Sequence, residues 1–223
     1  MFESKYSKIL TVILVIVVMA IVGLLGYLGY DYYKKYIVNS EAEDFVNNFT
    51  ADATEEQNIE EGNEESSGSW DDLNIADENL NSQNNGDSKK PTYNGFVTLG
   101  TIYIPATECK YPILEKMTTT SLENGVVFVW GAGINKAGNT VIAGHNYRNG
   151  QFFSNNKKLN IGDKIKITDN DKKTLTYTIY NKFETTDNDT SFYQRDTGGK
   201  PEISLSTCTD NGKGRLIILA NIQ

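Results

Sequence analysis

Residues 203–220 read ISLSTCTDNGKGRLIILA, and this stretch carries the pattern that decides the fold. The runs Ile203–Thr207 and Arg215–Ala220 are short and rich in aliphatic residues, and the turn-forming residues TDNGKG lie between them. Two such runs predict antiparallel strands joined by a turn. Arg215, which opens the second strand, would then return to a position beside Cys208, which follows the first.

Runs of the same kind fill the chain after Pro91. They are Gly100–Ile104, Tyr111–Ile113, Thr140–Ala143, Lys164–Thr168 and Thr174–Phe183. The residues Asp169–Asn170–Asp171 separate the last two runs and are typical of a hairpin turn. Short helical turns are expected at Thr120–Val127 and Gln151–Leu159. Seven or eight short strands with few helices predict an all-β barrel or sandwich over residues 91–223.

An apolar segment lies near the start of the chain. The twenty residues Ile9–Leu28 carry no charge, and a helix of that length crosses a hydrocarbon core of roughly 30 Å. A membrane anchor is preferred to a cleaved signal peptide, because the run is longer than a usual signal core and lacks a small-residue cleavage site. Residues 1–38 are therefore expected to form a stub and one transmembrane helix, and the shortness of the eight-residue stub favours its placement in the cytoplasm. Interfacial tyrosines and lysines close this segment, at positions Tyr27, Tyr30, Tyr32, Tyr33, Lys34 and Lys35.

Residues 39–90 form an acidic block that is poor in apolar side chains. Residues 39–88 contain 15 Asp and Glu and no Lys or Arg. Such a composition cannot bury enough apolar surface to offset the entropy of ordering, so a flexible, extended linker is expected. An acidic docking tail for a basic partner is the alternative. The first part of the block is expected to continue the membrane helix as a stalk, because Ala42, Phe45, Val46 and Phe49 recur at helical spacing.

The acidity of the linker hides a mildly positive C-terminal part. The whole chain has a net charge of −8, yet residues 89–223 carry 17 basic and 12 acidic side chains. This small excess and the lack of an aromatic and basic repeat argue against a nucleic-acid partner. The motif Asp187-Asn-Asp189 begins like a calcium loop but lacks its glycine and glutamate, and no Cys/His cluster suggests zinc. We expect no metal and no cofactor.

Two cysteines are too few for a disulfide framework, although one disulfide between them stays open at this level. Cys109 precedes a strand and is interpreted as a core residue. Cys208 instead ends a strand, His145 follows Thr140–Ala143, and Arg215 opens another strand. A histidine taken alone more often satisfies a structural hydrogen bond. Together with a thiol nucleophile and a permanent cation, it can exchange protons with an amine while the cation steadies an oxyanion.

Four motifs resemble those of the sortases, cysteine transpeptidases of Gram-positive surfaces, and the residues His145, Cys208 and Arg215 follow one another in the same order as in that family. The motifs are GTIYIP at 100–105, GNTVIAGHN at 138–146, LSTC at 205–208 and RLIIL at 215–219. The resemblance runs from about Asn94 to Gln223. It implies a closed eight-stranded β-barrel with short helices behind one N-terminal transmembrane helix. It also implies a single-pass protein of the cell membrane with its catalytic domain outside.

The resemblance also implies roles for individual residues. Cys208 would be the nucleophile, His145 the general acid and base, and Arg215 the stabiliser of substrate or oxyanion. Thr207, Ser206 and Asn146 would contact the substrate. That substrate would be a secreted protein with a C-terminal LPXTG-like sorting signal, and the acceptor would be an amine of a cell-wall precursor. A peptidase that uses water and an inactive, anchored peptide-binding module are the alternatives.

Loop lengths bear on the sortase class. LSTC is similar to the motif of class B, but the segment Glu184–Glu202 is short for the helical insertion of that class. Class A and class D are compatible with this length. Class C enzymes carry a lid with an Asp-Pro-aromatic motif, and Trp70-Asp71-Asp72 lacks the proline, so class C and a pilin-polymerising role are disfavoured.

Overall fold

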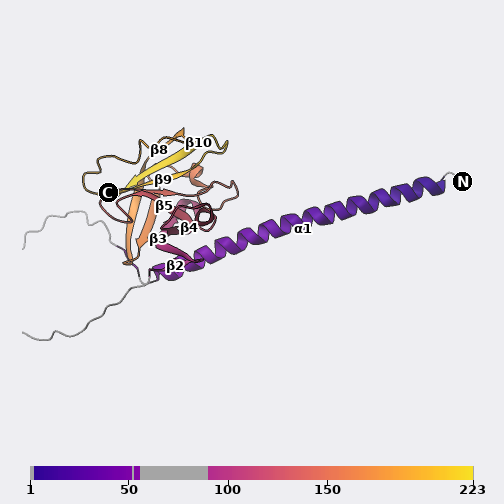
Figure 1. Cartoon of the computed structure of the whole chain (residues 1–223), viewed down its shortest axis with the longest axis horizontal. Coiled ribbons are helices and arrows are strands. Elements are labelled where there is room, and N and C mark those ends of the chain that lie inside the picture. The colour runs from indigo at the N-terminus through magenta and orange to yellow at the C-terminus, as the bar shows by residue number, and fades with distance from the viewer. Residues whose placement is uncertain (1–2, 52, 56–89, 223) are drawn as a thin grey trace, which may run out of the picture.

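A computed structural model describes residues 3–51, 53–55 and 90–222 of the chain. The part of the acidic linker at 56–89, and with it the motif at Trp70-Asp71-Asp72, lies outside the described residues. In the described part, one long helix leads into a β-barrel, and the helix projects far beyond it (Figure 1).

The long helix α1 spans Glu3–Thr50, and the other helical elements are single turns. These are η1 (Pro105–Thr107), α2 (Thr119–Leu122) and η2 (Asn156–Lys158). The described strands are β1 (Thr54–Glu55), β2 (Thr92–Tyr93), β3 (Phe96–Ile104), β4 (Cys109–Leu114), β5 (Val126–Gly131), β6 (Gly138–Ala143), β7 (Lys164–Asp169), β8 (Lys173–Thr186), β9 (Pro201–Cys208) and β10 (Gly214–Asn221).

The eight longer strands close into a barrel. Their order is β3-β4-β5-β6-β9-β10-β8-β7, and β7 pairs back onto β3. Closure removes the free edges that an open sheet would leave unpaired. The β7–β8 hairpin is antiparallel and turns after Asp169, as predicted. The expected all-β, eight-stranded barrel behind an apolar helix is confirmed.

Strand β5 corrects the prediction of a helical turn over Thr120–Val127. The helix α2 ends at Leu122, and residues 126–131, which read VVFVWG, form a strand that pairs with β4 and β6. β-branched and aromatic side chains favour a pleated, buried surface, and Gly125 separates this run from the preceding turn. The second helical turn is confirmed in part, because only Asn156–Lys158 within Gln151–Leu159 is helical.

The apolar core lies inside the barrel. Fully buried side chains such as Ile102, Ile113, Ile142, Leu205 and Ile218 come from strands around the whole barrel and pack together. A smaller cluster of Val141, Phe192, Ile217 and Leu219 lies apart from this core. Alternate side chains of a strand point to opposite faces. The smaller cluster therefore lies on the outer face of β6 and β10.

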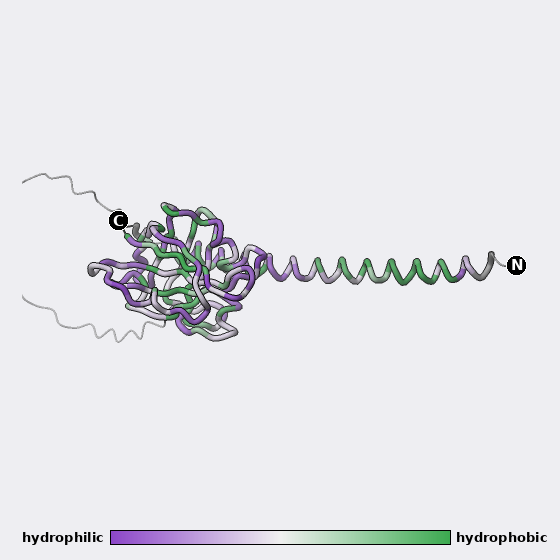
Figure 2. Tube along the Cα trace, turned by 90° about the horizontal axis from the view of Figure 1, so that it is seen from above, coloured by the Kyte–Doolittle hydropathy of each residue, from purple (hydrophilic) through white to green (hydrophobic). Residues whose placement is uncertain are grey.

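Helix α1 has two parts that differ in their surroundings. Its apolar segment is exposed along its whole length, as expected for a helix long and apolar enough to cross a membrane (Figure 2). Beyond it, the predicted helical stalk is present and lies on the barrel, with Ala42, Val46 and Phe49 buried. The ring of Phe45 lies 5.1 Å from that of Tyr93. The helix thus crosses position 38 without a break and packs on the barrel.

Candidate active site

Three neighbouring strands end at one place on the barrel. Strands β6 and β9 are parallel, with Ala143 opposite Ser206, and the amide of Gly144 donates to the carbonyl of Ser206 at 3.1 Å. His145 and Cys208 each follow two residues after these partners. Strand β10 runs antiparallel to β9 and places Arg215 directly opposite Cys208. The topology therefore brings the three predicted catalytic residues to adjacent strand ends.

Cys208 and Arg215 also share a face of the sheet. Strand alternation places Cys208 on the face of Ser204 and Ser206, and Arg215 on the face of Ile217. Val141 and Ile217 belong to the outer apolar cluster, so this is the outer face of the barrel. The Val141 and Ile217 side chains are fully buried, so they support this face from beneath.

Cys208 and Arg215 are in direct contact. The guanidinium Nη1 donates to the sulfur across 2.8 Å, and both residues are half-buried. A planar guanidinium keeps its charge at any physiological pH and offers several donors in a fixed fork. It can therefore stabilise a negative sulfur and, through its other N–H groups, an oxyanion formed next to that sulfur.

His145 lies at the start of a loop that folds over the end of β6. The imidazole ring stacks on the Tyr147 ring at 4.6 Å between centroids. Burial lowers the pKa of His145 from its ordinary value of 6.5, and the carboxylate of Glu123 opposes that shift. The imidazole is consequently neutral at pH 7 in most molecules and is able to accept a proton.

The predicted substrate contacts are placed differently from one another. Ser206 is half-buried on the outer face with Cys208. Thr207 is buried on the opposite face, where its hydroxyl donates to the carbonyl of Gly144 at 2.7 Å, so its side chain does not lie beside the sulfur. Asn146 donates to the Cys208 carbonyl at 2.9 Å and to Asp210 at 3.0 Å, which ties the histidine loop to the cysteine loop.

Sequence reasoning missed the residues that build the wall of this face. The segment between β8 and β9 carries Phe192 and Tyr193 over the outer cluster. Arg195 holds this segment by bonds to Ser204 (2.9 Å) and to the carboxylate of Glu202 (2.6 Å). The side chain of Asn139 bonds to the carbonyls of Phe192 and Tyr193. Arg195 is half-buried and lies seven residues before Glu202, but the sequence does not show that these two residues pair.

The two cysteines are both free, so the disulfide left open by the sequence is not present. Cys109 is buried in β4, as expected of a core residue, and burial raises its pKa to about 12. Such a thiol is a poor nucleophile at neutral pH. Among the described residues, no group of three or more His, Cys, Asp or Glu side chains could hold a metal ion. The chemistry of the site therefore centres on Cys208.

Comparison with known proteins agrees with this arrangement. The model of the sortase domain matches residues 102–223, which is more than half of the chain. The chain belongs to the sortase family. It is 33% identical over 119 residues to sortase A of Bacillus anthracis, and the match covers 52% of this chain and 55% of that relative. This sortase therefore spans about half the length of its curated relative.

Solved structures show the same fold. A sortase D5 transpeptidase of Clostridium perfringens is 32% identical, with a TM-score of 0.52, over 60% of this chain and 82% of that one. Sortase A of Corynebacterium diphtheriae is 27% identical, with a TM-score of 0.53, over 57% and 61% of the two chains. Sortase C1 of Streptococcus suis, at 23% identity and a TM-score of 0.52, shares the fold over 56% of this chain. The resemblance inferred from the four motifs is thus confirmed at the level of the family.

Proposed function

We propose that this sortase is a cysteine transpeptidase in which Cys208 is the nucleophile, His145 the general acid and base, and Arg215 the oxyanion stabiliser. The 2.8 Å contact between the Arg215 guanidinium and the Cys208 sulfur carries the proposal. It joins a permanent cation to a half-buried thiol, and His145 follows the end of the adjacent strand β6. A structural cysteine gains nothing from such a partner, whereas a nucleophile gains stabilisation of its charged form.

The first half-reaction forms a thioester. Cys208 gives its proton to the neutral imidazole of His145 as the sulfur attacks the scissile carbonyl carbon. Arg215 stabilises the resulting oxyanion, and the C–N bond then breaks. The departing amine takes the proton from the His145 imidazolium, which leaves the acyl group on sulfur and the imidazole neutral.

The second half-reaction passes the acyl group to a new amine. The neutral imidazole accepts a proton from the incoming amine as its nitrogen attacks the thioester carbon. The C–S bond breaks, and the proton returns to the sulfur of Cys208. Each proton and electron pair is thereby restored, so the enzyme needs no cofactor for turnover.

Membership of the sortase family supports a proposal for the substrate class. We propose a secreted protein with a C-terminal LPXTG-like sorting signal, which would bind beside Cys208 on the outer face of β6 and β9. The acceptor would be an amine of a cell-wall precursor. Helix α1 would anchor the enzyme with its barrel outside the cell. The segment between β8 and β9 forms turns and no helix, which supports class A or D over class B.

A peptide assay tests the proposal directly. The full-length protein in detergent micelles is given a sorting-signal peptide with and without an amine, and the products are identified by mass. Transfer to the amine is expected, with the Cys208→Ala variant folded and inactive. Release of acid alone in the presence of varied amines would favour a peptidase, and full activity of Cys208→Ala would remove the assignment of the nucleophile.

A further inference from the structure

The loop that begins at His145 folds back onto its own start. The amide of Phe153 donates to the carbonyl of His145 at 3.1 Å, and Asn146 and Phe152 form an isolated β-bridge. The backbone of Phe152 has a φ of 49°, a value that L-residues seldom adopt, so the surroundings must hold it there. Whatever holds Phe152 therefore also holds His145.

A row of four aromatic rings in contact links the catalytic imidazole to the barrel wall. The ring of His145 lies 4.6 Å from that of Tyr147, and Tyr147 lies edge to face with Phe152 at 5.8 Å. Phe152 in turn lies 4.7 Å from Tyr111 of β4. Phe152 and Tyr111 are buried, while Tyr147 is 44% exposed. A half-exposed ring has few neighbours to fix it, so its position depends on Phe152.

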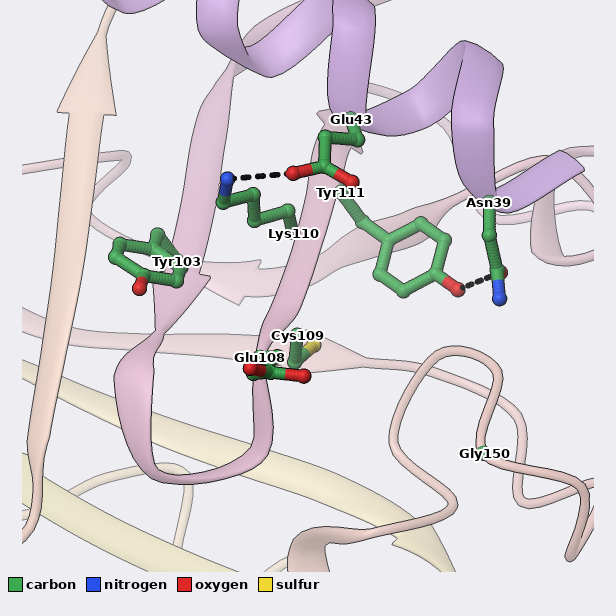
Figure 3. Close-up of a pocket in the computed structure, with 8 residues that line it drawn as sticks. All are labelled: Asn39, Glu43, Tyr103, Glu108, Cys109, Lys110, Tyr111 and Gly150. Carbon is green, nitrogen blue, oxygen red and sulfur yellow. Dashed lines mark hydrogen bonds and ion pairs between the residues drawn. The ribbon is translucent and has the colours of Figure 1, made fainter.

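Helix α1 contacts both this row of rings and the histidine loop. The hydroxyl of Tyr111 donates to the side-chain oxygen of Asn39 at 2.6 Å (Figure 3). The ammonium of Lys35, one turn earlier on the helix, donates to the carbonyl of Asn149 in the histidine loop. Burial raises the pKa of Tyr111, so its hydroxyl keeps the donated proton at neutral pH. Both bonds join the juxtamembrane helix to the support of His145.

These polar bonds lie among cavities and not within continuous packing. A cavity of about 350 Å³ separates the helix from the loop that carries Gly150 (Figure 3). A second cavity, of about 500 Å³, is lined by residues that include Lys35, Tyr147, Asn149 and Phe152. Because the helix and the loop do not pack together across these cavities, the hydrogen bonds of Lys35 and Asn39 carry much of the restraint that α1 places on the loop.

We propose that Tyr147 is a positioning residue for the His145 imidazole, and that α1 holds it in place through Lys35 and Asn39. The juxtamembrane part of the helix is then a working part of the active site as well as a tether. The inference rests on the proposed role of His145. A misplacement of a catalytic group by about 1 Å can cost on the order of 100-fold in rate, so even a loose loop would be felt.

The first test uses the bond between Asn39 and Tyr111 in the full-length protein in lipid nanodiscs. Asn39→Ala and Tyr111→Phe are each expected to lower kcat about tenfold, with less than a twofold change in the KM for the sorting peptide. The double variant should be no worse than either single variant, because both remove the same bond. Additive losses in the double variant would contradict the link.

The matched control is Glu43→Ala, one turn further along the same helix. It removes the 2.8 Å ion pair with Lys110, which does not reach the histidine loop (Figure 3). Its kcat should remain that of the native protein. If Glu43→Ala lost as much activity as Asn39→Ala, the helix would serve general stability and not the position of His145.

The second test reads the imidazole without any turnover. His145 is the only histidine of the chain, so one pair of imidazole proton signals reports on it. Loss of the stacked ring in Tyr147→Leu should move these signals downfield and lower kcat, and Tyr147→Phe should restore both in large part. Unchanged signals in Tyr147→Leu and Asn39→Ala would overturn the inference while peptide transfer by the native protein still supported the proposed function. Absence of transfer by the native protein would remove that function instead.

Discussion

The hydroxyl of Thr207 donates a hydrogen bond to the carbonyl of Gly144 across 2.7 Å, and so ties the residue before Cys208 to the residue before His145. The bond lies on the inner side of the parallel strands β6 and β9, and Cys208 lies on the outer side of β9. It therefore fixes how far apart the two strand ends stand, without any contact with substrate.

Replacement of Thr207 separates a structural role from a substrate contact. Thr207→Val keeps the volume and removes the donor, so we expect a loss of about 1–2 kcal/mol in the free energy of unfolding and a lower kcat. Thr207→Ser keeps the hydroxyl and should lose less of both. Chemical denaturation and peptide transfer measure the two effects. A change confined to the KM for the peptide, with native stability, would instead place Thr207 in the substrate pocket.

Gly144 is required by the close approach of a neighbouring ring. A Cβ added there would stand 2.8 Å from Cδ2 of the buried Phe153 and 3.0 Å from Cγ1 of Val126. Gly144→Ala is thus expected to destabilise the protein by about 1–3 kcal/mol and to displace His145, with a large loss of turnover. Thermal unfolding and kcat check both parts. Gly162→Ala is not used as the control, because the φ of 97° at Gly162 would strain any side chain. Ala132→Ser, at an exposed position, is the control and should keep native stability and turnover.

Arg215→Lys tests the planar fork of the guanidinium. A lysine keeps the charge but cannot hold the sulfur and an oxyanion at once with fixed geometry. We expect kcat to fall on the order of 100-fold or more, with little change in the free energy of unfolding. Single-turnover formation of the thioester should slow by a similar factor. A variant that forms the thioester at the native rate would exclude Arg215 from oxyanion stabilisation.

The protonation of His145 predicts the acid limb of the pH profile. Because burial lowers its pKa below 6.5, the folded protein keeps a neutral imidazole to a lower pH than the unfolded chain does. Turnover that needs the neutral form is retained just below pH 6.5 and is lost as the pH falls through the lowered pKa. Folding stability also falls in this acidic range, because the unfolded chain binds the extra proton.

Glu123→Gln sharpens that prediction. The Glu123 carboxylate favours the imidazolium, so its removal should lower the pKa of His145 further. Titration of the single imidazole by NMR measures the shift in both proteins. The acid limb of kcat should move in the same direction. A pKa that rises in Glu123→Gln would show that the carboxylate does not face the imidazole in solution.

The helix α1 should contribute to the stability of the barrel. Phe49 is buried against it, and the ammonium of Lys172 lies 3.5 Å from the centre of the Phe49 ring. Phe49→Ala is expected to cost about 3 kcal/mol of unfolding free energy, a typical value for loss of a buried ring. The neighbouring Asn48 is exposed, so Asn48→Ala should have native stability. Equal melting temperatures for the two variants would show that the helix does not stabilise the barrel.

The sequence predicted that Cys208, His145 and Arg215 follow or open strands, because strand ends are local features. Cys208 and Arg215 lie on either side of a turn signal, so their pairing follows from short-range geometry. The inner position of Thr207 was also within reach, since neighbours on a strand face opposite ways. Strand β5 was missed because the helical turn expected after Thr120 was extended into the apolar run that follows it. The β-branched and aromatic residues of that run favour a strand.

The docking of α1 was beyond sequence reasoning in a different way. The spacing of Ala42, Phe45, Val46 and Phe49 indicated a helix with one apolar side, but not what that side would cover. Its partners on β3 and β4 lie more than forty residues further along the chain. Nothing in a periodic pattern names such a partner. The same holds for Asn39, whose bond to Tyr111 depends on that docking.

Because α1 runs without a break from its apolar segment onto the barrel, it would fix the distance and the orientation of the barrel relative to a bilayer. Lys35, which bonds the histidine loop, lies seven residues after Leu28, or about 10 Å along the helix axis. In a bilayer, tilting the helix would raise or lower the mouth of the site, and spinning it would sweep that mouth around a small circle. A protein held in this way would diffuse laterally at a constant distance from the bilayer and rotate about the helix axis. The direction in which its site faces would change with that rotation.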